Sequence, residues 1–301
     1  MTVQAGASVP WLRVSVVIPA LNEARNLPHV FARLPPDVHE VIVVDGLSVD
    51  DTIAVARQLR PDVRIVLQSR RGKGNALACG FAAATGDIIA MIDADGSTDP
   101  AEIPLFVQAL VEGAEFAKGT RFAHGGGSDD ITRLRALGNH ALVGFVNLCH
   151  GSHYTDLCYG YNAFWRRLVP LLGLDADSPA PPNGGRLWGD GFEVETLIHL
   201  RVAAAGLAVT EVPSFEHSRI HGVSNLNAAQ DGLRVLRTIL AELRRSRRRR
   251  RGGRAVAAPA MAAPAVAAAV AVVPAKVAPE PLAAGRSGDH WGPDLATRAV
   301  E

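Results

Sequence analysis

Sulfur is scarce in this sequence. Three cysteines occur in 301 residues, Cys79, Cys149 and Cys158, and none of them forms a CxxC pair or another spacing typical of metal ligands. Buried reduced thiols are therefore expected in place of disulfides or a cysteine-held metal. Reduced thiols are typical of a cytosolic enzyme, so the sequence predicts a cytoplasmic protein.

The chain also lacks a large net charge. Its 31 lysines and arginines nearly balance 30 acidic residues, leaving +1, so the protein as a whole is not expected to bind polyanions. Arginines nevertheless crowd into the segment Arg244–Arg254. No aromatic residue interleaves them, so this segment does not predict a nucleic-acid partner. It predicts peripheral contact with the inner face of a membrane, with a merely solvated segment as the alternative.

No apolar run has the properties of a signal peptide or a membrane span. Val14–Ile18 is too short for a signal core and runs into polar Asn22 and Glu23. Residues 255–275 lack charge, but they are mostly alanine with three prolines and provide little transfer energy into a bilayer. Composition therefore predicts an N-terminal tail at 1–12, one folded domain at 13–243, an arginine-rich segment at 244–254 and a disordered Ala/Pro-rich tail at 255–301.

Short β-branched runs alternate with helical segments through the first hundred residues. The predicted strands are Val14–Ile18, Val41–Val44, Val63–Leu67 and Asp87–Ile92, and the predicted helices between them are Ala24–Leu34, Thr52–Leu59 and Asn75–Thr85. Continuous apolar runs are typical of strands that are buried on both faces. The alternation predicts an α/β fold with a doubly wound, mostly parallel sheet and flanking helices.

The rest of the domain is predicted from weaker signals. Strands are expected near Glu115–Lys118 and Ala208–Val212. Helices are expected from Asp99-Pro100 onward and at Arg133–Leu148, Trp165–Leu172, Phe192–Ala205 and Asn227–Arg245. The cap-then-proline order of Asp99-Pro100 is the preferred start of a helix.

Polar residues follow each of the first four predicted strands. They are Pro19, Asn22 and Glu23 after the first, Asp45 after the second, Ser69, Arg70 and Arg71 after the third, and Asp93 and Asp95 after the fourth. The carboxyl ends of parallel strands lie along one edge of the sheet, where the ligand crevice of an open α/β fold forms. The sequence therefore predicts one cleft lined by carboxylate, amide and guanidinium groups.

Asp93-Ala94-Asp95 is the most specific of these signals. Two carboxylates one residue apart at a strand end can reach the same hard cation. Mg²⁺ or Mn²⁺ is bound in this manner by few protein oxygens, and substrate phosphates complete its coordination shell. We predict a metal site formed by Asp93 and Asp95.

Two common nucleotide motifs are missing. No GxGxxG follows the first strand, which excludes the usual dinucleotide fingerprint. The segment RGKGN lacks the GxxxxGK[ST] spacing of a P-loop and lies after the third strand. A nucleotide in this cleft is therefore expected to be held by side chains and a metal.

The ordered blocks VVIPALNE, VIVVDGLSVDDT, RGKGNAL and DADGSTDP resemble the family 2 inverting glycosyltransferases of the GT-A fold. The later segments KGTRFAHGGGS, YGYNAFWR and FEHSRIHGVSNL resemble the branch of dolichol-phosphate mannose synthases and polyprenyl-phosphate glycosyltransferases. This resemblance implies that Pro19, Asn22, Glu23 and Asp45 hold the nucleoside, that Arg71 and Lys73 approach the nucleotide, and that Asp93 and Asp95 hold a metal on the donor diphosphate. The chain departs from the pattern at Gly46, where a second acid is usual, and at Gly96 and Ser97, where some members carry a longer side chain.

Further candidates complete the predicted site. His217 or His221 is a candidate third metal ligand. Asp190, Glu193 and Glu195 are candidate general bases for a hydroxyl acceptor, and they are grouped with Asp95 and Arg121 as catalytic candidates. Arg133, Arg135 and Arg219 are candidates to bind an anionic acceptor.

The function predicted first is inverting sugar transfer from a nucleotide-diphosphate sugar to a lipid phosphate at the cytosolic membrane face. The alternative keeps this donor but gives the sugar to a soluble acceptor, a small phosphorylated acid or a natural-product scaffold. A sugar-nucleotide pyrophosphorylase is disfavoured because PALNE is not the glycine-rich loop that such an enzyme needs. A non-catalytic nucleotide-sugar binder is disfavoured by the intact pair Asp93 and Asp95.

Overall fold

The computed structural model describes residues 12–182, 185–222 and 228–251. Its strands are β1 (Val14–Ala20), β2 (Glu40–Asp45), β3 (Arg64–Leu67), β4 (Ile88–Met91), β5 (Phe116–Thr120), β6 (Gly127–Ser128), β7 (Asn162–Trp165), β8 (Val209–Pro213) and β9 (Phe215–Glu216). Its α-helices are α1 (Leu27–Phe31), α2 (Thr52–Leu59), α3 (Lys73–Ala83), α4 (Ile103–Val111), α5 (Arg133–His150), α6 (Val169–Leu172), α7 (Val194–Ala205) and α8 (Ala228–Arg251). Short 3-10 turns at Pro100–Glu102 and Arg166–Leu168 precede α4 and α6.

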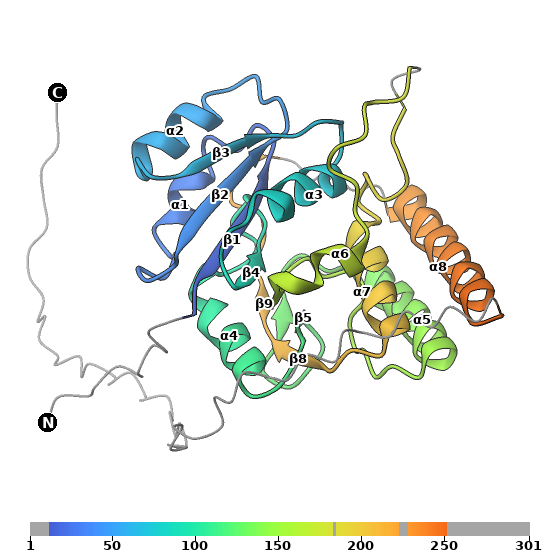
Figure 1. Ribbon diagram of the computed structural model, residues 1–301. Coiled ribbons are helices and arrows are strands. Elements are labelled where there is room, and N and C mark those ends of the chain that lie inside the picture. The colour runs from blue at the N-terminus through green and yellow to red at the C-terminus, as the bar shows by residue number, and fades with distance from the viewer. Residues whose placement is uncertain (1–11, 183–184, 223–227, 252–301) are drawn as a thin grey trace, which may run out of the picture. The chain divides into compact units, whose positions relative to one another are not determined.

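Seven strands form the main sheet, in the order β3-β2-β1-β4-β7-β5-β8 (Figure 1). β1 pairs in parallel with β2 and with β4, β2 with β3, and β5 with β8. β7 is antiparallel to both of its neighbours, β4 and β5. The predicted α/β class with a mostly parallel sheet and flanking helices is therefore confirmed.

The structure differs from the sequence prediction at several elements, among them the short pair β6 and β9, which was not predicted. Asn162–Trp165 is a strand, although Trp165 was expected to start a helix, because its backbone pairs with β4 and β5 on both sides. The first helix is shorter than Ala24–Leu34: it begins at Leu27 and ends at Phe31, and the residues before it form a turn in which the amides of Asn26 and Leu27 donate to the Glu23 carbonyl. The last helix continues through the arginines to Arg251 instead of ending at Arg245.

Two apolar clusters lie under the helices. The larger one surrounds the sheet, where Phe116 of β5 and Phe164 of β7 stack and Phe81 of α3 meets Phe164 edge-on. The smaller one joins α5, α7 and α8, which lie side by side in Figure 1, through residues such as Val146, Leu200 and Ile239. None of the described helices combines the length and the apolar character needed to cross a bilayer.

His199 on α7 is a buried histidine that the fold holds neutral. Its side chain has no exposed surface, and its ring nitrogens lie 2.9 Å from the Leu157 carbonyl and 3.1 Å from Asn162 Oδ1. Burial lowers the pKa of His199 to about 3, and the nearby ammonium of Lys118 acts in the same direction. The protonated ring is therefore excluded from the folded protein at neutral pH.

This burial predicts a pH dependence of stability. The unfolded chain protonates His199 below about pH 6.5 while the folded chain does not, so the free energy of unfolding should fall by about 1.4 kcal/mol per pH unit below that value. Urea unfolding at pH 7.0 and 5.5 should show a shallower pH dependence in His199→Gln than in the wild type. His153→Gln, at an exposed position, is the control and should keep the wild-type slope. Equal slopes in all three proteins would contradict the assignment.

Candidate functional site

The parallel register of β1 and β2 aligns the first two loops of the predicted cleft. Pro19 pairs with Val44 and Ala20 with Asp45, so Asn22 and Glu23 emerge beside the end of β2. Asn22 joins the two loops by two hydrogen bonds. Its side-chain oxygen accepts from the backbone amide of Val49 at 2.8 Å, and its backbone amide donates to the Ser48 hydroxyl at 2.9 Å. The predicted convergence of these loops at one sheet edge is what the structure shows.

Asp45 has one satisfied and one unsatisfied oxygen at this edge. Its Oδ2 accepts from the backbone amides of Leu47 and Ser48 at 2.9 and 3.0 Å. Its Oδ1 is buried and has no hydrogen-bond partner among the described residues. A buried acceptor without a partner is rare in folded proteins, and a donor group on a bound nucleoside is the kind of partner that it lacks.

Asp93 and Asp95 follow β4, and each is paired with a cation. Lys73 Nζ lies 2.6 Å from Asp93 and 2.7 Å from Glu195. Arg219 donates to Glu23 at 2.8 Å and contacts Asp95 at 3.0 Å. Burial opposes the charge of Lys73, but Asp93 and Glu195 outweigh it and raise the pKa of its ammonium, while burial raises the pKa of Glu195.

The charges at this edge fit a divalent cation. The four carboxylates of Glu23, Asp93, Asp95 and Glu195 face the two cations Lys73 and Arg219. A surplus of two negative charges therefore remains, and carboxylate oxygens are the donors that Mg²⁺ and Mn²⁺ prefer. Ala94 between the two aspartates is buried, which fixes the turn that presents them.

A histidine third ligand, expected at His217 or His221, is not brought to the two aspartates. The ring of His217 lies against Phe215, with its Nδ1 3.9 Å from Asp129, and the ring of His221 lies against His29. Within the described ranges no three His, Cys, Asp or Glu side chains converge on one point. The backbone amide of His217 donates to the Ser97 carbonyl and that of His221 to the Asn26 side-chain oxygen, and a histidine ligand stays a prediction.

Asp190, a predicted general base, is a buried structural anchor. Arg70 donates to both of its oxygens, at 2.9 and 3.0 Å, and the Leu187 amide donates to Oδ2 at 2.8 Å. Its backbone carbonyl also accepts from the Gly74 amide at 2.9 Å, so the loop carrying Lys73 is locked against the loop that leads to α7. Both oxygens of Asp190 are thus hydrogen-bonded within the protein, and its role as a general base stays a prediction.

Glycine is required at two positions of this contact. A Cβ on Gly74 would stand 1.7 Å from the Gly189 carbonyl oxygen, and one on Gly72 would stand 2.0 Å from that of Asp190. Gly72 also has a φ of +131°, which L side chains rarely adopt. The glycines of the RGKGN segment are therefore required because the backbone of residues 189–190 packs directly against them.

The two other candidate bases differ in accessibility. Glu195 on α7 is 5% exposed and committed to Lys73. Glu193 is half-buried at the start of α7, where its carboxylate accepts from the Gly191 amide at 3.2 Å. The structure brings Glu195, but not Asp190, into the ionic cluster with Asp93.

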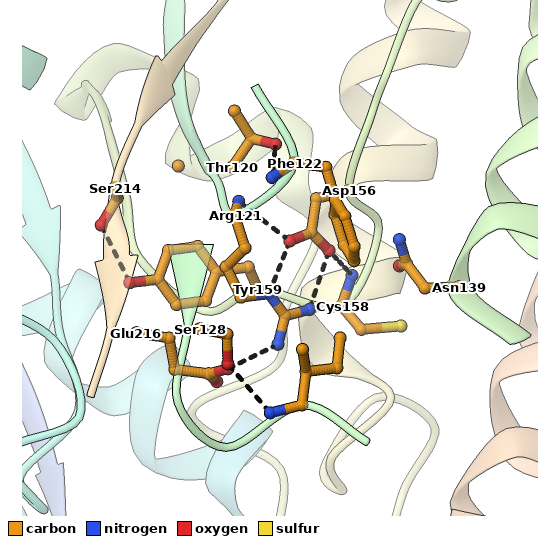
Figure 2. A network of polar contacts seen from close by, with 12 residues as sticks. Thr120, Arg121, Phe122, Ser128, Asn139, Asp156, Cys158, Tyr159, Ser214 and Glu216 are labelled. Carbon is orange, nitrogen blue, oxygen red and sulfur yellow. Dashed lines mark hydrogen bonds and ion pairs between the residues drawn. The ribbon is translucent and has the colours of Figure 1, made fainter. Parts of the chain in front are cut away.

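Arg121, predicted to be catalytic, lies in a buried network of its own (Figure 2). It binds Asp156 with two nitrogens, at 2.7 and 2.9 Å, and donates to Glu216 at 3.0 Å. Ser128 also donates to Glu216, so the network joins β6 to β9. Arg121 is 7% exposed and its guanidinium is held by these two carboxylates, so its catalytic role stays a prediction.

The remaining predicted cations are on the surface. Arg71 is exposed, at the loop between β3 and α3. Arg133 is exposed at the first turn of α5, whereas Arg135 is half-buried and bonded to Asp130 at 2.9 Å. Of the three acceptor candidates, Arg219 alone contacts the carboxylate cluster within the described part of the chain.

Sequence reasoning missed the partners of the buried arginines. Asp156 is 35 residues from Arg121, Glu216 is 95 residues away, and Asp190 is 120 residues from Arg70. No local spacing links such residues. The available signal was the position of each arginine directly after a predicted strand, since an arginine that becomes buried there needs a carboxylate partner.

Comparison with known proteins agrees with this geometry. Glycosyl transferase family 2 matches residues 15–168. The polyprenol monophosphomannose synthase of Mycolicibacterium smegmatis is 31% identical over 232 residues, covering 73% of this chain and 83% of that protein. An uncharacterized glycosyltransferase of Mycobacterium tuberculosis is 44% identical over 108 residues, which are 36% of this chain and only 48% of that protein.

A solved structure supports the same assignment. Glucosyl-3-phosphoglycerate synthase of Mycobacterium tuberculosis, crystallised with Mn²⁺, UDP and glucosyl-3-phosphoglycerate, matches with a TM-score of 0.58 at 25% identity. The match covers 80% of this chain and 86% of that one, and it confirms the predicted GT-A fold. The match to residues 15–168 and the related polyprenol monophosphomannose synthase show that the chain belongs to glycosyl transferase family 2.

Proposed function

We propose that this chain transfers a sugar from a nucleotide-diphosphate donor to a polyprenyl phosphate. The surplus of negative charge at the sheet edge is the observation that carries the donor half: four carboxylates face only Lys73 and Arg219 among the described residues. A divalent ion held by Asp93 and Asp95 balances that surplus and leaves coordination positions for the donor phosphates. The Mn²⁺ and UDP in the related synthase support this part of the proposal.

Different residues around the metal site bind the nucleoside and the diphosphate of the donor. Asp45 offers its unpartnered oxygen to the nucleoside, beside the loops of Pro19 and Asn22. Lys73 and Arg219, with the exposed Arg71, supply positive charge for the diphosphate. When bound, the metal supplies Lewis-acid stabilisation of the charge on the departing nucleoside diphosphate.

The commitments of the candidate bases favour an acceptor that is already ionised. Arg70 occupies Asp190 and Lys73 occupies Glu195. A hydroxyl acceptor needs a base to remove its proton, while a phosphate carries its charge before it binds. Only Glu193 among the three candidates lacks an ion pair within the described ranges.

The outward face of α5 supports a lipid acceptor. Leu134, Leu137 and Leu148 are 75%, 68% and 85% exposed, and with Phe145 they recur at helical spacing opposite the buried Val143 and Val146. No acidic residue lies on this helix, and Arg133 begins it. Together with the exposed Arg244 and Arg245 of α8, this face is suited to an anionic membrane surface. Arg254, at the end of the predicted arginine-rich segment, lies outside the described residues.

A soluble phosphorylated acid is the second candidate acceptor. The related synthase was crystallised with glucosyl-3-phosphoglycerate, the product of transfer to such an acid. This acceptor would also be anionic, and it would use Arg219 or Arg133 without needing the apolar face of α5. A lipid acceptor therefore requires the apolar face of α5, whereas a soluble acid requires only the basic side chains.

The metal assignment predicts the effect of Asp95→Asn. Loss of one carboxylate charge should lower kcat/KM by about 10²- to 10³-fold while the melting temperature changes little, because Asp95 is at a loop and not in the core. Chelation should stop the wild-type reaction, and Mn²⁺ should restore it. Asp129→Asn, an exposed acid elsewhere in the chain, is the control and should keep activity. Normal turnover by Asp95→Asn would refute the assignment.

The acceptor assignment predicts the effect of Arg133→Gln. With polyprenyl phosphate in vesicles, the KM for acceptor should rise about tenfold while the KM for donor is unchanged, because one charge-assisted contact is lost. Leu137→Glu should impair transfer to vesicles but not donor hydrolysis, and Arg57→Gln on α2 is the exposed control.

Glu193→Gln should slow transfer little, because an ionised acceptor phosphate has no proton for a general base to remove. Transfer to 3-phosphoglycerate alone, with Glu193 essential, would support the second candidate and overturn the first.

A further inference from the structure

Each of the two aspartates proposed to hold the metal already has a protein cation on it. The ammonium of Lys73 bridges Asp93 and Glu195, and the guanidinium of Arg219 bridges Asp95 and Glu23. The two bridges are alike, since each cation joins one aspartate of the Asp-Ala-Asp turn to one glutamate from another element. The free protein thus satisfies its own carboxylates with cations from α3 and from the segment after β9.

A metal ion arriving alone must compete with these cations. The ammonium lies 2.6 Å from one oxygen of Asp93, and the guanidinium lies 3.0 Å from one oxygen of Asp95, so each cation occupies one side of a carboxylate proposed to bind the metal. Their side chains are only 16% and 26% exposed, so neither can swing freely into water when it is displaced. A divalent ion in their midst would meet like charges at short range, which opposes its binding.

A diphosphate changes this balance. Its oxygens accept hydrogen bonds from ammonium and guanidinium groups and also coordinate a divalent metal. Lys73 and Arg219 can then exchange Asp93 and Asp95 for phosphate oxygens while keeping Glu195 and Glu23. The exchange frees two aspartate oxygens at the moment when the diphosphate also brings negative charge for the metal.

We propose that Lys73 and Arg219 couple metal binding to diphosphate binding, closing the carboxylate pair to the metal until a nucleoside diphosphate takes over the two cations. The proposal rests on the proposed function, which places the metal at Asp93 and Asp95. It adds that the free site discriminates against the metal alone. By linkage, each ligand strengthens the binding of the other by the same factor.

The experiment measures Mn²⁺ binding to the full chain without activity. Calorimetry of Mn²⁺ alone, and of Mn²⁺ in the presence of UDP or GDP with metal–nucleotide association in solution subtracted, gives the coupling factor. Wild type should bind Mn²⁺ at least about tenfold more tightly with the preferred nucleotide. Arg219→Gln should bind Mn²⁺ alone about tenfold more tightly than wild type, because one repelling charge is gone, and its coupling factor should shrink.

Matched variants make the outcome specific. Lys73→Gln tests the second bridge and replaces Arg219→Gln if that protein does not fold, as judged by circular dichroism. Arg33→Gln is the control, because Arg33 pairs with Asp99 a few residues further along the same loop and should leave the coupling unchanged. Equal affinity of wild type for Mn²⁺ with and without nucleotide, or no gain in either bridge variant, overturns the coupling while the metal site stands. Failure to bind Mn²⁺ even in the presence of bound nucleotide overturns both.

Discussion

The pairing of β1 with β2 and β4 is the constraint on which the site depends. It sets Ala20 beside Asp45 and Val17 beside Met91, so the loops that follow β2 and β4 leave the same edge of the sheet, on either side of the end of β1. Parallel strands with right-handed crossovers leave no other edge for those loops. Acids that are distant in sequence therefore meet, and their mutual repulsion must be offset by cations from elsewhere. Lys73 and Arg219 offset part of that repulsion in the free protein and leave a surplus of two negative charges.

Buried ion pairs form the frame around this edge. Arg70 with Asp190 locks the loop of Lys73 to the start of the α7 region, and Arg121 with Asp156 and Glu216 holds β6 and β9. Such pairs add less net stability than their geometry suggests, because both charges lose water. Separating either pair would leave a buried charge uncompensated. This free-energy cost keeps the loops that carry the paired residues in place. Through β9 the second pair also sets the path of the segment that delivers Arg219.

Donor and acceptor place different requirements on the protein. The donor half relies on a compact set of charges at the sheet edge, where position matters to within a hydrogen bond. In the function that we propose, the acceptor half relies on the exposed face of α5, where the leucines would meet an apolar environment and the arginines an anionic one. The commitment of Asp190 and Glu195 to their own cations is consistent with an acceptor phosphate that arrives without a proton to lose.

The sequence by itself determined the α/β class, the first four strands and the gathering of Asp45, Asp93 and Asp95 at one edge. The strands follow from local patterns, namely apolar runs and the polar residues that end them. Their shared direction then brings those polar residues to one edge of the sheet. Only the tertiary structure decided that Asn162–Trp165 is a strand, because β4 and β5 pair with it from both sides. It alone also decided the ion-pair partners of Asp190 and Arg121, which lie 120 and 35 residues away. Whether a carboxylate is a base or an anchor depends on which cation folding brings to it, and local sequence carries no record of that contact.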